Sequence, residues 1–82
     1  MTKKTKDFLN RYNVTEAERK VLETIGLEGV IAKFTAMDEH TWEKLGDYFT
    51  GWLLGDNPKA RFNYWARKAG VTEAEMDIYM TY

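Results

Sequence analysis

The residue types that could do chemistry in this chain gather around its single histidine. His40 is followed three residues later by Glu43, and Asp38 and Glu39 come directly before it. Helical residues three apart are neighbours, so His40 and Glu43 could share one metal ion. The di-iron motif has the opposite order, Glu-x-x-His, and needs a second histidine that this chain lacks. The acidic residues suit instead the first turn of a helix, where they stabilise its N-terminus, and we expect no metal site.

The chain lacks the side chains on which nucleophilic catalysis usually depends. The chain of 82 residues contains neither serine nor cysteine, so Ser–His and Cys–His pairs are excluded. It has no glycine-rich phosphate loop, and a helical chain of this length has little room for an enclosed pocket. We therefore expect a non-enzymatic protein with no catalytic residues and no cofactor.

A phrase that occurs twice predicts two helix starts. Asn13-Val14-Thr15-Glu16-Ala17-Glu18 returns as Gly70-Val71-Thr72-Glu73-Ala74-Glu75. Thr15 and Thr72 fit the N-cap position, where a hydroxyl oxygen accepts from a free backbone N–H. Glu18 and Glu75, three residues further on, have the spacing of a capping box. Each copy of the phrase therefore predicts a helix that begins at its threonine.

The remaining apolar residues recur with helical spacing, and no segment shows the alternation of a strand. Leu27, Val30, Ile31 and Phe34 follow the i, i+3, i+4, i+7 pattern. Trp42, Leu45, Phe49, Trp52 and Leu53 form a second buried stripe, with Tyr48 at its margin. Glycine and proline mark the ends of the segments. The predicted helices cover residues 5–12, 15–25, 27–36, 39–54, 58–69 and a last one from 72.

The end of the chain predicts a corner. Ala66 lies four positions before Gly70, the spacing of a small residue and a turn glycine in helix-turn-helix units. We expect one all-α domain over residues 1–82, a compact bundle of five to six short helices with a helix-turn-helix-like C-terminal corner. Residues 1–4 are expected to be flexible.

Charge distribution argues against base reading by the last helix. Residues 57–70 carry four basic side chains and no acidic one, whereas residues 71–82 carry three acidic side chains and no basic one. The last helix also lacks the Arg, Lys, Asn and Gln side chains that usually read bases. Its carboxylates would repel the phosphates that dominate affinity for DNA.

A surface for another protein is the stronger prediction. On the fifth helix Tyr64 lies away from the apolar stripe and near Arg61 and Lys68, and tyrosine and arginine are both enriched in binding hot spots. The last helix has apolar residues on two sides, so Ile78 and Tyr82 are expected to face outward with Glu75. The predicted protein-binding residues are Arg61, Tyr64, Lys68, Glu75, Ile78 and Tyr82. A homodimer through Ala74, Ile78 and Tyr82 is a further hypothesis.

These observations predict a small regulator, inhibitor or adaptor that binds a protein and competes with nucleic acid through its acidic last helix. By analogy of size and type, such proteins are often encoded by phages or mobile elements. The alternative is a helix-turn-helix-like regulator that binds nucleic acid through Lys3, Lys4, Arg61 and Lys68. No signal peptide and no apolar run of membrane-spanning length is present, so we expect a cytoplasmic location and no membrane partner.

Overall fold

In the computed structural model, which describes residues 1–82 throughout, the chain forms six α-helices and no strand. The predicted all-α fold class is confirmed. No helix combines the length and the apolar character that crossing a bilayer requires. The helices are α1 (Lys3–Arg11), α2 (Glu16–Thr24), α3 (Gly26–Thr35), α4 (Glu39–Leu53), α5 (Lys59–Ala69) and α6 (Glu73–Thr81).

The helices group into two compact units. Unit 1 consists of Met1–Thr35 together with Glu73–Tyr82, and unit 2 consists of Ala36–Thr72. Unit 2 is therefore inserted, in sequence, between α3 and α6.

Unit 1 is built around α3. This helix packs against α1, α2 and α6, and α2 also packs against α6. Phe34 of α3 stacks on Tyr79 of α6, with ring centroids 4.6 Å apart. Burying large apolar side chains in this way is the main source of stability for a chain without disulfides. The buried apolar residues of unit 1 are Phe8, Leu22, Leu27, Val30, Phe34, Met76 and Ile78.

Threonine caps start the first two helices. Thr2 accepts a hydrogen bond from the backbone N–H of Thr5, so α1 begins at Lys3, inside the segment expected to be flexible. Thr15 accepts from the N–H of Glu18 at 3.2 Å, and its hydroxyl donates to the Glu18 carboxylate at 3.0 Å. The first copy of the repeated phrase is thus confirmed as a helix start. The second copy precedes α6, which begins at Glu73.

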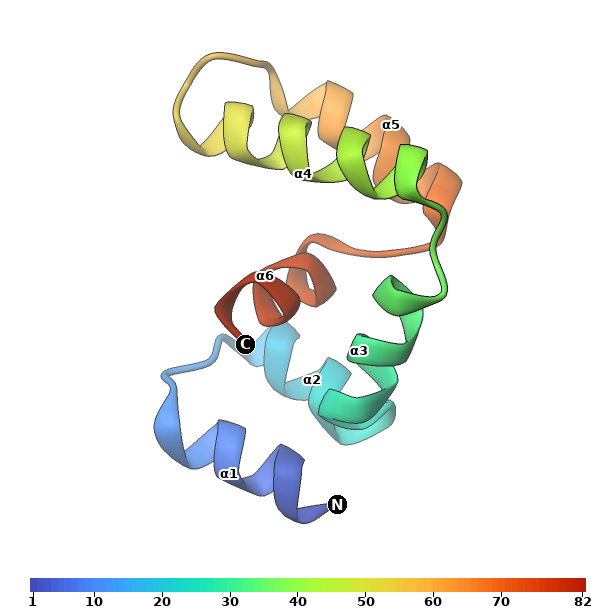
Figure 1. Ribbon diagram of the computed structural model, residues 1–82. Helices are drawn as coiled ribbons and strands as arrows, with labels where there is room; N and C mark the ends of the chain where they lie inside the picture. The colour runs from blue at the N-terminus through green and yellow to red at the C-terminus, as the bar shows by residue number, and fades with distance from the viewer. The chain divides into compact units, whose positions relative to one another are not determined.

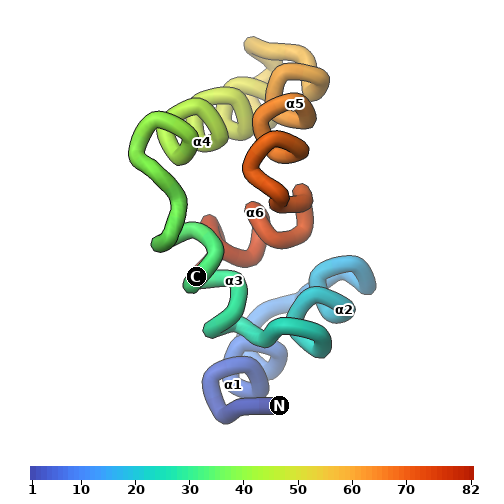
Figure 2. Tube along the Cα trace, turned by 90° about the vertical axis from the view of Figure 1, so that its right-hand side faces the viewer, coloured from blue at the N-terminus to red at the C-terminus, as the bar shows by residue number.

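Unit 2 is an antiparallel hairpin of α4 and α5, which lie side by side in both views (Figure 1, Figure 2). At one end of the hairpin the Lys59 ammonium lies 4.8 Å from the Trp52 ring. At the other end the rings of His40 and Trp65 meet edge to face at 5.7 Å. The core between the helices consists of Leu45, Phe49, Phe62 and Ala66, with the two phenylalanine rings 5.0 Å apart.

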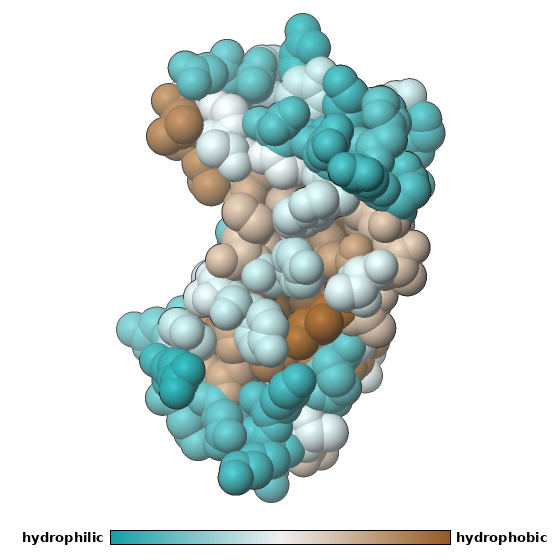
Figure 3. Space-filling model, viewed as in Figure 1, coloured by the Kyte–Doolittle hydropathy of each residue, from teal (hydrophilic) through white to brown (hydrophobic).

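The closed end of the hairpin exposes two leucines. Leu53 is 61% exposed and Leu54 is 72% exposed, and the space-filling view shows a brown patch at this end of α4 (Figure 3). The expectation that Leu53 is buried is wrong. The reason lies in the link between α4 and α5. The backbone N–H groups of Asp56 and Asn57 in this link both donate to the Gly51 carbonyl, at 2.7 Å and 3.2 Å. The link therefore covers Gly51 and leaves Leu53 outside.

Glycine ends α5 as the sequence predicted. Gly70 adopts φ +75°, a left-handed conformation that side chains rarely tolerate. Only Val71 and Thr72 then separate it from α6. Because α5 and α6 belong to different units, the helix-turn-helix-like angle between them stays a prediction.

Candidate binding surface on α4 and α5

The predicted protein-binding residues fall into both units. Arg61, Tyr64 and Lys68 lie on α5 in unit 2, whereas Glu75, Ile78 and Tyr82 belong to unit 1. Each half of the predicted surface therefore lies within one unit.

The expectation that the α6 residues face outward is wrong for two of the three. Ile78 is completely buried, and Glu75 is buried beside Lys33 of α3, whose Nζ lies 2.5 Å from the Glu75 carboxylate. Neither side chain is available to a partner, and the proposed dimer face loses its central residue. Tyr82 is exposed, as expected. Competition with nucleic acid through α6 loses Glu75 in the same way.

The physical reason is that the structure covers both apolar sides of α6, whereas one side was expected to face outward. Met76 and Ile78 lie on nearly opposite sides of the helix and both are completely buried, while Met80 is half exposed. Helix α6 packs against α2 and α3 in unit 1. The surfaces that cover α6 are assembled only in the folded chain, so the sequence of α6 alone does not show them.

The α5 half of the prediction forms a continuous stripe. Arg61, Tyr64, Trp65 and Lys68 have the spacing i, i+3, i+4, i+7, so they share one side of the helix. The core residues Phe62 and Ala66 lie on another side. Tyr64 is 58% exposed, which is unusual for a large aromatic side chain, and Arg61 and Lys68 are exposed beside it.

Tyr48 of α4 extends this stripe across the hairpin. The Arg61 guanidinium lies 5.8 Å from the centroid of the Tyr48 ring. A shallow hollow of about 380 Å³ opens between Tyr48, Ala60, Arg61, Tyr64 and Trp65. We call the residues Tyr48, Arg61, Tyr64, Trp65 and Lys68 the aromatic–cation face.

Ring contacts hold this face together. The Lys68 ammonium lies 5.0 Å from the Trp65 ring and 6.0 Å from the Tyr64 ring. The rings of Tyr64 and Trp65 meet edge to face at 5.7 Å. Exposed cation–π contacts contribute only about 0.5–1 kcal/mol each. They are enough to orient the side chains, and they leave the N–H donors of the cations directed to solvent or to a partner.

The acidic side chains of the hairpin lie outside the aromatic–cation face. Glu39, Glu43 and Asp47 recur every fourth residue and so follow one line along α4. At 100° per residue this line lies on the side of α4 away from its core and away from Tyr48. Helix α5 has no acidic residue. The aromatic–cation face is therefore positive, although the formal charge of the whole chain is −1.

The residues around His40 have structural partners. The Asp38 carboxylate accepts from the hydroxyl and the backbone N–H of Thr41, at 2.7 Å and 3.0 Å, and so caps α4. These two hydrogen bonds, the hydroxyl first, lower the pKa of Asp38. His40 lies against Trp65 as described above. Nowhere does the structure gather three or more His, Asp or Glu side chains in an arrangement that could hold a metal ion.

The residues predicted for nucleic acid also divide between the units. Lys3 and Lys4 are exposed on α1 in unit 1, and Arg61 and Lys68 belong to the aromatic–cation face of unit 2. Lys4 lines a hollow that also contains Tyr82. The structure thus brings together two residues that the sequence analysis had assigned to different partners.

Sequence reasoning missed Tyr48 and Trp65 as members of the surface. Tyr48 lies at the margin of the apolar stripe of α4, and Trp65 is half-buried on α5. Large aromatic residues at the edge of an amphipathic stripe, opposite a basic helix, were the available signal.

No protein-family model, curated protein sequence or solved structure matches this chain.

Proposed function

We propose that this chain is a non-enzymatic binding module whose aromatic–cation face holds an acidic segment of a partner protein. The observation that carries the proposal is Tyr64, more than half exposed between Arg61 and Lys68 on a face without acidic side chains. Tyrosine and arginine are enriched among the few residues that dominate the binding energy of protein interfaces. Carboxylates of a partner would meet both cations, while its apolar atoms would cover Tyr64 and the neighbouring hollow.

The charge pattern favours a protein over nucleic acid. Only Arg61 and Lys68 on this face are free to neutralise phosphates, and α4 carries its line of carboxylates on another side. With about two phosphates neutralised, the salt-dependent term that dominates nucleic-acid affinity stays small. A short acidic segment of a protein, by contrast, does not require a longer row of basic residues. The module would act as a regulator, inhibitor or adaptor in the cytoplasm, roles that require no catalytic group.

The test is an affinity pull-down from native lysate with matched variants. Tyr64→Ala and the double variant R61Q/K68Q alter the face. Asn63→Ala and Arg67→Gln alter exposed residues on another side of α5 and serve as controls. Captures are washed at 150 and 300 mM salt, with and without nuclease, and circular dichroism confirms that each variant is helical.

We expect one or more proteins to survive nuclease and to be retained by the wild type and both controls. The same proteins should be lost, at least tenfold, with Tyr64→Ala and with R61Q/K68Q. Equal retention by all variants would contradict the surface assignment. If nuclease removes every partner, the nucleic-acid alternative takes first place, and its salt dependence can then be measured on single-stranded oligonucleotides.

A further inference from the structure

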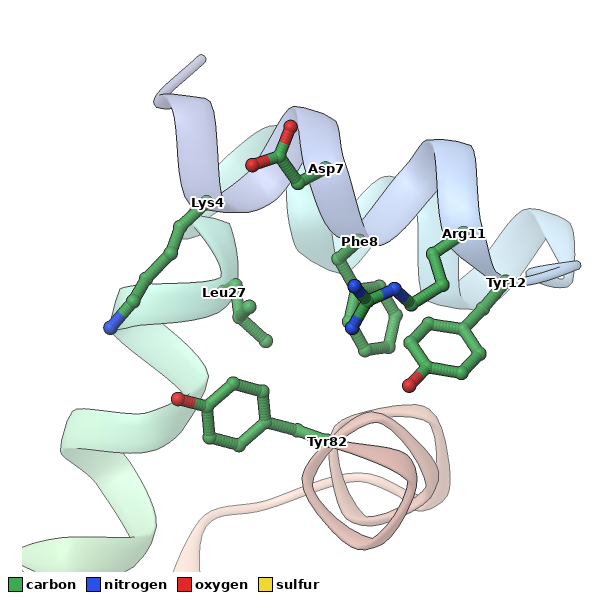
Figure 4. A pocket seen from close by; sticks show the side chains of 7 residues that line it. All are labelled: Lys4, Asp7, Phe8, Arg11, Tyr12, Leu27 and Tyr82. Atoms are coloured by element: carbon green, nitrogen blue, oxygen red, sulfur yellow. The ribbon is translucent and has the colours of Figure 1, made fainter.

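A second candidate site lies in unit 1, and it does not depend on the proposed function. A hollow of about 220 Å³ opens between α1 and the end of α6 (Figure 4). Helix α1 provides Lys4, Phe8 and Arg11, all on one side of the helix, and Tyr12 directly follows it. Leu27 of α3 and Tyr82 complete its lining, and Asp7 lies at the rim.

The floor of the hollow is apolar and fixed. Phe8 and Leu27 are both buried core residues. The ring of Phe8 lies 4.8 Å from the ring of Tyr12, at an interplanar angle of 46°. Tyr12 is therefore held in place by its neighbour before any ligand arrives, which lowers the cost of ordering the site on binding.

The walls of the hollow are aromatic, and its rim is cationic. Tyr12 directly follows α1 and Tyr82 directly follows α6, so the two tyrosines approach the space from different parts of the chain (Figure 4). Arg11 also lines the space. Lys4 reaches the other end of the space. The carboxylate of Asp7 points away from the space between the tyrosines (Figure 4). Two cations and one carboxylate line the hollow, so its net charge is positive.

We propose that this hollow binds a small aromatic carboxylate. An aromatic ring would lie on Phe8 and Leu27 between the two tyrosines, because aromatic rings favour offset and edge-to-face contacts with one another. The carboxylate would meet Arg11, whose planar fork matches a carboxylate with two hydrogen bonds, with Lys4 adding charge. The hollow is smaller than the pockets that take drug-sized ligands, so the ligand is a single-ring molecule.

The test is an NMR titration of the ¹⁵N-labelled full chain with phenylacetate. Amide signals of residues that line the hollow should shift and saturate, with a Kd on the order of 1 mM for so small a ligand. Phenylacetamide, which keeps the ring and lacks the charge, should bind at least fivefold more weakly. Acetate, which keeps the charge and lacks the ring, should bind at least tenfold more weakly.

Variants at exposed positions test the assigned contacts without disturbing the core. Arg11→Gln should raise the Kd for phenylacetate at least fivefold, and Lys4→Gln two- to threefold. Arg19→Gln and Lys6→Gln, which remove cations outside the hollow, should leave the Kd unchanged. The proposal is overturned if phenylacetate shows no saturable shift up to 10 mM, if phenylacetamide or acetate binds equally well, or if Arg11→Gln binds like the wild type.

Discussion

The hydroxyl oxygen of Thr5 in α1 accepts a hydrogen bond from the backbone N–H of Leu27 in α3, at 3.0 Å. Ile25, the one residue between α2 and α3, is the C-cap of α2, and Gly26, at φ +72°, begins α3, so no residue is free to act as an ordinary N-cap of α3. A side chain from another helix takes that role. The start of α3, on which the rest of unit 1 packs, therefore depends on α1.

Replacing Thr5 with valine should test this cap. The valine keeps the shape of the side chain and removes the hydroxyl, which leaves the Leu27 N–H buried without its partner. We expect the free energy of unfolding to fall by about 1–3 kcal/mol, measured by urea denaturation. Thr5→Ser, which keeps the hydroxyl, should lose clearly less. Equal losses in the two variants would mean that packing rather than the hydrogen bond stabilises this position.

The Glu28 carboxylate should make stability depend on acid pH. Its pKa lies below the ordinary value of 4.5 because its own backbone N–H and then the Thr2 hydroxyl, at 2.9 Å, donate to the charged form. A carboxyl with a lowered folded-state pKa stabilises the protein above its ordinary pKa. That contribution disappears as the pH falls from 4.5 through the folded-state value.

The expected result is a loss of stability below pH 4.5 that is smaller in Glu28→Gln than in the wild type. Urea denaturation between pH 3 and pH 7 measures it, and NMR titration of Glu28 checks the lowered pKa directly. Glu23→Gln, which changes an exposed carboxylate on α2, is the control and should follow the wild type. A Glu28 pKa at or above its ordinary value would contradict the assignment.

The ion pair between Lys33 and Glu75 should couple α3 to α6. Glu75 is buried, whereas the Lys33 side chain is 41% exposed, so the pair is only partly shielded from solvent. A double-mutant cycle with Lys33→Met and Glu75→Gln should give a coupling energy of about 1–2 kcal/mol. Because the carboxylate is buried, most of this coupling should persist at 1 M salt.

The matched control for this cycle is Lys20→Met combined with the same Glu75→Gln variant. Lys20 and Lys33 line one hollow beside Glu75, but the 2.5 Å contact is made by Lys33. We expect the Lys20 cycle to give a coupling below about 0.5 kcal/mol. Equal coupling in both cycles would show that Glu75 responds to positive charge in general and not to one partner.

Two glycines of α4 should respond differently to alanine. A Cβ atom added at Gly46 would meet nothing within 4 Å, so Gly46→Ala should stabilise the helix by about 0.5–1 kcal/mol. A Cβ atom at Gly51 would collide with the Asn57 side chain, which the link to α5 places there. The Asn57 amide must turn aside, so Gly51→Ala should be less stable than Gly46→Ala by about 0.5–1 kcal/mol. Thermal melts measure both variants, and equal stability of the two would show that the Asn57 side chain moves away without cost.

Signals that lie close together in sequence predicted the helices well. Thr15 was expected as an N-cap and caps α2, and Gly70 ends α5 as expected. A cap is formed by residues three apart, so its chemistry is visible in the sequence alone. The start of α5 differs by one residue: the helix was expected from residue 58, but Pro58 is its N-cap and the helix begins at Lys59.

Features that depend on distant residues could not be predicted in this way. The burial of Glu75 depends on Lys33, which lies 42 positions earlier in the chain. The cap on α3 comes from Thr5, and the hollow of unit 1 joins Lys4 to Tyr82. In the aromatic–cation face, only the α5 stripe was visible as a sequence pattern. Tyr48 joins it because α4 and α5 pack side by side.

The insertion of unit 2 between α3 and α6 has a consequence for the order of folding. Helix α6 can reach α2 and α3 only when the intervening chain closes as a loop, and the entropy cost of closure grows with the length of free chain. An antiparallel hairpin forms through local contacts and brings its own two ends together, so it shortens that loop. We therefore expect substitutions at the Phe49–Phe62 contact to slow the completion of unit 1, a unit to which neither residue belongs.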